Sequence, residues 1–215
     1  MIVLRLSNLS SLRLTVTVTT VFGESHMASL LPMVPVHDLI VEFLNTVLSE
    51  DGRHEDLLES DEGVMLWFEK QGLTGIGVVD CTRVRGLAYE AKALREVVRH
   101  LLNQRKSGEA VDVNRLNRFL HAASYSVELM DSGEGALKSV RRYACTSTTQ
   151  AVAPIALAAA DLLANGDFRL LGKCEGDHCA MWFYDRTRAH RRRWCNMAIC
   201  GNRQKIARFR SKLKG

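Results

Sequence analysis

The segment KCEGDHCAMWFYDRTRAHRRRWCNMAICGNR, residues 173–203, decides how the C-terminal part of this chain folds. Its four cysteines form two pairs, Cys174 with Cys179 and Cys195 with Cys200, and each pair encloses four residues. Two close pairs on separate arms can present four thiolates tetrahedrally to one ion, as structural zinc sites do. So small a segment buries too little apolar surface to fold alone, and bound metal can supply the missing stability. The spacing therefore predicts a structural zinc site made by these four residues.

Other interpretations of the cysteines are reduced core residues or two disulfides, but the paired spacing and the weak local hydrophobicity favour metal. His178 adjoins Cys179 and could replace it as a ligand. Neighbouring residues rarely reach the same ion together, so we place His178 outside the ligand set. Four protein thiolates leave no coordination position for water, which favours a structural zinc over a catalytic one.

Charge divides the chain into two parts. Residues 173–215 carry twelve Lys or Arg against three acidic residues, a net charge of +9, whereas residues 1–172 carry −4. Most of these cations are arginines, whose planar guanidinium suits phosphate and guanine. These cations could instead simply form the solvated face of a helix, or they could form a protein-binding surface. We predict DNA contacts from Arg188, Arg191, Arg192, Arg193, Arg203, Lys205, Arg208 and Arg210.

The rest of the chain predicts a mainly helical domain with one β-hairpin. Apolar residues recur at helical spacing over 36–48, 61–71 and 82–102, after Asp112, and after Ser147. Alternation over 125–143, with a turn at 131–135, predicts the hairpin. An apolar content of 47% supports an ordinary core. The expected organisation is therefore a helical domain over 31–170 followed by a small zinc-binding module over 171–215.

Residues 1–30 are set aside as a leader, either poorly ordered or translated from too early a start, with Met27 and Met33 as alternative starts. No run reaches the roughly 18 apolar residues of a membrane span, so no membrane partner is expected. The chain shows no convincing secretion signal, and a reducing cytosol would keep thiols available for metal. We expect a cytoplasmic protein, with Cys81 and Cys145 as small buried hydrophobic residues.

The run from Trp194 to Arg203 resembles the CGNR-type zinc finger, named for its closing tetrapeptide. The family pattern also has an upstream cysteine pair, an aromatic stretch with aspartate (here Phe183-Tyr184-Asp185) and an Arg-Trp-Cys element (here Arg193-Trp194-Cys195). The similarity covers about 43 residues, and it implies zinc in the finger.

The preceding region resembles the bacterial ABATE domain, on the helix-end marker Val41-Glu42-Phe43-Leu44-Asn45-Thr46. Family members often have Asp where Glu42 stands. The later hairpin and Ala-rich helix fit the same pattern. The resemblance implies a bacterial transcription regulator induced by stress.

The leading hypothesis is a DNA-binding regulator, with no enzymatic activity, whose helical domain controls the zinc module. Asn45, Glu42 and His37 gather at one helix and are candidate contacts for a small-molecule effector, although Asn45 could instead simply terminate that helix. A homodimer would suit a two-fold operator. The rivals are a zinc-stabilised protein-interaction module and an enzyme of unknown reaction. Against the enzyme, the sequence shows no nucleophile–base arrangement and no phosphate loop.

Overall fold

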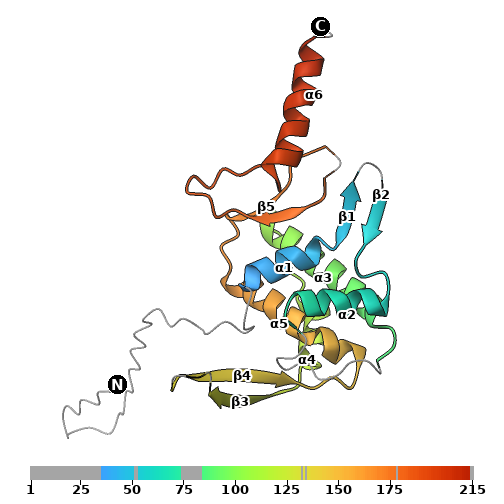
Figure 1. The fold of residues 1–215 in the computed structure, drawn as a ribbon, viewed down its shortest axis with the longest axis vertical. Coiled ribbons are helices and arrows are strands. Elements are labelled where there is room, and N and C mark those ends of the chain that lie inside the picture. The colour runs from blue at the N-terminus through green and yellow to red at the C-terminus, as the bar shows by residue number, and fades with distance from the viewer. Residues whose placement is uncertain are drawn as a thin grey trace, which may run out of the picture.

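The fold combines a helical domain with a small C-terminal module that contains the four cysteines, called the zinc module below, which packs on one end of the helical domain (Figure 1). The computed structural model describes residues 35–50, 53–73, 84–131, 133, 135–177 and 179–213. The prediction of a mainly α fold is confirmed. Six α-helices lie in the described part of the chain: α1 (Val36–Leu44), α2 (Asp61–Lys70), α3 (Leu87–Ser107), α4 (Asn114–His121), α5 (Thr148–Asn165) and α6 (Asn202–Lys212).

Helix α5 lies at the centre of the helical domain and packs against α1, α3 and α4. Alanine is its commonest residue, and half of its residues are buried, most of them alanines beside larger apolar residues such as Val152, Ile155 and Leu162. Small side chains on every face let several helices approach one helix closely, which is why α5 becomes the central element. Ser147 caps its first turn by accepting a hydrogen bond from the Gln150 N–H at 3.2 Å, as the capping-box spacing predicts.

Two caps define where α2 and α3 begin, and one of them links the two helices. Ser60 accepts a hydrogen bond from the Gly63 N–H, so α2 begins where the sequence predicts. The Asp61 carboxylate accepts hydrogen bonds from the N–H groups of Gly86 and Ala88 at 2.8 and 2.7 Å, so one side chain caps a second helix. Gly86 takes a left-handed φ of 84°, and α3 starts after it, five residues later than expected.

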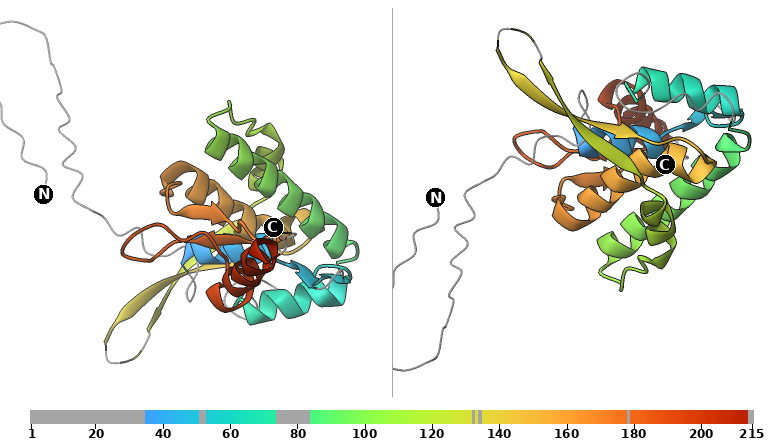
Figure 2. Two further views of the ribbon diagram at one scale, coloured as in Figure 1. Left: turned by 90° about the horizontal axis from the view of Figure 1, so that it is seen from above. Right: turned by 90° about the horizontal axis from the view of Figure 1, so that it is seen from below.

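Three antiparallel strand pairs occur among the described residues, where the sequence predicts one. The predicted hairpin is confirmed as β3 (Tyr125–Asp131) with β4 (Leu137–Tyr143), and it projects from the helices with all of β3 exposed (Figure 2). The pair β1 (Val47–Glu50) with β2 (Arg53–Asp56) was missed, because Val47 and Leu48 continue the helical spacing of α1. The third pair, β5 with β6, belongs to the zinc module.

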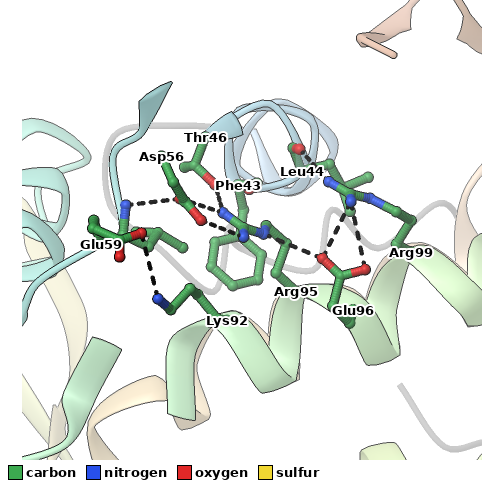
Figure 3. Close-up of polar contacts among 10 residues, drawn as sticks. Phe43, Leu44, Thr46, Asp56, Glu59, Lys92, Arg95, Glu96 and Arg99 are labelled. Atoms are coloured by element: carbon green, nitrogen blue, oxygen red, sulfur yellow. Dashed lines mark hydrogen bonds and ion pairs between the residues drawn. The ribbon is translucent and has the colours of Figure 1, made fainter. Parts of the chain in front are cut away.

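A buried arginine fastens the end of α1 to α3 (Figure 3). Arg95 is 4% exposed and donates two 2.7 Å hydrogen bonds to the carboxylate of Asp56 and one to the hydroxyl of Thr46. Arg99, one turn later, donates to the Leu44 carbonyl at 3.0 Å. Because Thr46 also donates to the Phe43 carbonyl, α1 ends at Leu44 rather than continuing to residue 48.

Some expectations fall on residues that the structure does not describe: the leader over 1–30, Cys81 and His178. Cys145 is half-buried against the core, and it is disulfide-bonded, so its interpretation as a simple small hydrophobic residue is wrong. Disulfides are rare in reducing compartments, so the expectation of a cytoplasmic protein does not predict this disulfide. No helix in the described ranges combines the length and apolarity needed to cross a membrane.

Candidate metal centre and nucleic-acid interface

The zinc module begins with one short pair of strands. Strands β5 (Leu171–Lys173) and β6 (Trp182–Tyr184) pair antiparallel, and the first cysteine pair lies on the connection between them. A long arginine-rich loop follows β6 and leads to Cys195. The chain then forms a π-helical turn, Met197–Gly201, which carries Cys200 and runs directly into α6.

The four cysteines predicted as ligands converge on one point. Their sulfur atoms all lie within 4.8 Å of one another. A tetrahedral ion with Zn–S bonds of about 2.3 Å requires sulfurs about 3.8 Å apart. The Sγ of Cys195 lies 3.7 Å from that of Cys179 and 3.6 Å from that of Cys200, close to this value. None of the four is in a disulfide, so the donor set fits zinc in number, chemistry and spacing.

Local backbone features hold each pair in place. The Gly176 N–H donates to the Cys174 sulfur at 3.4 Å, and the Cys179 N–H donates to the Gly176 carbonyl at 3.0 Å, which closes the first loop. In the second, the Asn196 side chain accepts from the N–H groups of Ala198 and Ile199. These bonds explain how short loops present sulfur inward without help from a large core.

The protonation of the thiols also favours a cation among them. Burial, together with Cys174 and Cys179 and against a lowering hydrogen bond with Cys195, raises the pKa of Cys200 to about 11. Burial and the neighbouring thiols also raise the pKa of Cys195 above its ordinary value. Burial acts the same way on Cys174, but hydrogen bonds from the backbone of Cys195 and Gly176 hold the pKa of Cys174 below its ordinary value. A positive ion among the sulfurs would favour the thiolate forms of Cys195 and Cys200 against this burial, as metal binding does.

Asp185 shapes the arginine-rich loop, a role that the sequence analysis did not assign. It is 4% exposed, and its two carboxylate oxygens accept hydrogen bonds from the N–H groups of Thr187 and Arg192 at 2.9 and 2.8 Å. Burial tends to raise the pKa of Asp185, but these backbone bonds hold it below its ordinary value. The Phe-x-Asp element was the signal available in the sequence. At the loop's tip His190 takes a left-handed φ of 47°.

The eight cations predicted to contact DNA are all exposed, and they divide between this loop and α6. Two of them also build the module. Arg192 stacks over the Phe183 ring at 4.7 Å and donates to the Trp194 and Cys195 carbonyls. Arg193 pairs with Glu175.

The predicted effector-binding residues lie where the module meets α1. Asn45 donates to the Trp182 carbonyl at 2.9 Å and accepts from the Trp182 N–H at 2.8 Å, so its amide joins residues 137 positions apart. His37 stacks on Tyr184 with ring centroids 4.2 Å apart. Glu42 is exposed and lines a cleft of ≈ 670 Å³ between α1 and the module.

A second contact closes the same junction. Arg186 donates to the Asp38 carboxylate at 2.5 Å and lies 2.5 Å from the His37 ring nitrogen. Burial, against the raising effect of Asp38, lowers the pKa of His37, which keeps that ring neutral beside Arg186 near neutral pH. Trp182 and Leu171 are part of the same hydrophobic core as α1 and α5, so the module is seated on the helical domain rather than tethered to it.

A helical domain carrying a four-cysteine zinc module is the class of protein that this fold and this site define. Residues 37–166 match the family model of the ABATE domain, described as "Putative stress-induced transcription regulator". Residues 170–212 match the family model of the CGNR zinc finger. The chain belongs to the ABATE family, and its C-terminal segment matches the CGNR zinc finger, with four cysteines positioned to bind a metal ion, consistent with zinc. Both are regulator or zinc-finger families rather than enzyme families. No curated protein matches the chain.

Proposed function

We propose that this protein is a transcription regulator that binds DNA through residues 171–215, under the control of a helical domain over 31–170. The observation that carries the proposal is that the four cysteines converge where two cationic elements, the 186–193 loop and α6, join the module. The net charge of +9 over residues 173–215 matches a polyanion. DNA offers regularly spaced phosphates on which two rigid cationic elements can bind at once.

Each element contributes in its own way. Arg188 and Arg191 lie exposed on the loop that Asp185 organises, and they would hold one stretch of phosphate backbone. Helix α6 has no buried residue and stands away from the rest of the protein, as Figure 1 shows, so DNA can approach it along its whole length. Arg203, Lys205, Arg208 and Arg210 would contact phosphates and base edges from this helix.

Control by the helical domain would pass through the junction with α1. The Asn45 amide and the Arg186–Asp38 pair set the position of β6, and β6 leads directly into the arginine-rich loop. An effector in the cleft beside Glu42 would alter that junction and so alter DNA affinity. A homodimer on a two-fold operator and a cytoplasmic location complete the proposal.

The test is a salt titration of DNA binding with the zinc-loaded full chain, followed by fluorescence anisotropy. If about six of the eight cations contact phosphates, affinity should fall by roughly a thousand-fold between 50 and 200 mM salt. Arg208→Ala should flatten the salt slope by about one contact. Arg169→Ala removes an exposed arginine outside the loop and α6 and should leave the slope unchanged. An affinity that does not change with salt would refute the proposal.

One observation favours a second candidate, a protein-interaction module: Ile206 and Phe209 on α6 are exposed. A pull-down repeated with excess unlabelled DNA separates the two functions. A partner protein that stays bound while DNA saturates the module would support the second function.

A further inference from the structure

Helix α6 carries an exposed apolar stripe that the described structure leaves uncovered. Ile206 is 52% exposed, Phe209 64% and Leu213, which directly follows the helix, 71%. Isolated apolar residues are common on surfaces, but these three recur at spacings of three and four residues and therefore lie along one face of the helix.

The cations of α6 lie beside this stripe in two rows. At about 100° per residue, the three apolar side chains fall within an arc of roughly 60°. On the same projection, Arg203 and Arg210 flank one side of the arc and Lys205 and Lys212 flank the other. The helix thus presents an apolar seam between two basic borders.

This arrangement fits the DNA major groove better than a second copy of the helix. α6 carries five cations and no acidic residue, so two copies packed seam to seam would bring like charges together. The major groove is about 12 Å wide, admits one α-helix, and has a phosphate backbone along each border. Its floor offers the 5-methyl group of thymine, which prefers apolar contacts.

We propose that α6 lies in the major groove with Ile206 and Phe209 against thymine methyl groups, while its two basic rows bind the phosphates on either side. This inference rests on the proposed DNA-binding function and adds the groove and the base feature that α6 recognises. The zinc site fixes the start of α6, since Cys200 lies one residue before Gly201, where the helix is joined to the module.

The test is a thymine-to-uracil exchange, which removes only the 5-methyl group. Duplexes selected from a random library by the zinc-loaded full chain are prepared with thymine and with deoxyuracil. Loss of one contacted methyl should weaken binding about four-fold, corresponding to about 0.8 kcal/mol per buried carbon group. In the Phe209→Ala variant the same exchange should have a smaller effect, because the methyl has lost its partner.

Leu66→Ala is the matched control. Leu66 is 66% exposed on α2, so its loss removes a similar apolar surface away from the module and should leave the thymine dependence intact. Equal affinity for thymine and uracil duplexes, or selected sequences without thymine, would overturn the inference while leaving DNA binding standing. A Phe209→Ala variant that changes oligomeric state but not thymine dependence would assign the seam to a second copy and also overturn it. A protein with no salt-dependent DNA binding would refute the proposed function itself.

Discussion

Replacing Asn45 by alanine tests how the zinc module is held on the helical domain. The substitution removes the amide that donates to the Trp182 carbonyl and accepts from the Trp182 N–H. Trp182 is 2% exposed, so its backbone groups are left largely without water. The Asn45→Ala protein should therefore lose the junction while keeping every zinc ligand.

The magnitude follows from the two polar groups left behind. A buried donor or acceptor that loses its partner costs about 1–3 kcal/mol. The cleft beside Asn45 admits water to part of the site, so the free energy of unfolding should fall by about 3 kcal/mol in total. For a chain of 215 residues this lowers the melting temperature by roughly 6–12 °C.

The assay is urea unfolding of the zinc-loaded protein, with zinc content measured beside it. Asn165→Ala is the control, because Asn165 makes one exposed hydrogen bond with Asp161 and its loss should change stability by less than about 0.5 kcal/mol. Zinc content should stay unchanged in both variants. Equal unfolding midpoints for the two variants would refute the reasoning and leave apolar packing of Trp182 as what holds the module.

Other expectations concern the metal, the buried ion pair and the strand pair. Cys200→Ser should abolish zinc binding, measured by metal analysis. Most of the helical signal in far-UV circular dichroism should remain, because the helical core contains none of the four cysteines. Full zinc content in the variant would contradict this prediction. Zinc should be released as pH falls, because protons compete with the metal for the thiolates. Zinc that is still fully bound near pH 4, where carboxyl groups protonate, would argue against thiolate ligands. Asp56→Asn should cost about 2–3 kcal/mol at neutral pH, since Asp56 keeps 18% exposure beside buried Arg95. Burial tends to raise the pKa of Asp56, but Arg95 holds it below 3.8. The ion pair therefore stabilises the protein above that pH. The difference in free energy of unfolding between variant and wild type should narrow as pH falls through the native pKa. Gly172→Ala places a Cβ 2.5 Å from the Phe183 ring and should cost about 1–3 kcal/mol in urea unfolding; an unchanged midpoint would show that the ring moves aside freely.

Strong local signals were enough to predict much of this protein. Cysteine spacing predicted the four sulfurs that converge. The long apolar periods predicted α5 closely and α3 with both of its ends displaced by five residues. Such features are set by neighbouring residues and by the chemistry of one ligand type. They do not depend on where distant parts of the chain finally lie.

The features that were missed depend on distance in the fold. Asn45 lies 137 residues from Trp182, and no pattern in either segment marks the other as its partner. The strand pair β1–β2 forms where Arg95 of α3 binds Asp56 and Thr46, so a contact far along the chain overrides the helical spacing of Val47. Asp185 acts by its burial, which the strands and the loop create together.

Local patterns in the chain thus predicted the four cysteines that converge and the helical class of the fold, and composition showed the concentration of positive charge near the C-terminus. Only tertiary packing decided that the module shares a hydrophobic core with α1, and that no residue of α6 is buried. The physical reason is range: hydrogen bonding within a helix and metal ligation by close pairs act over a few residues. Burial depends on which surfaces the whole chain brings together.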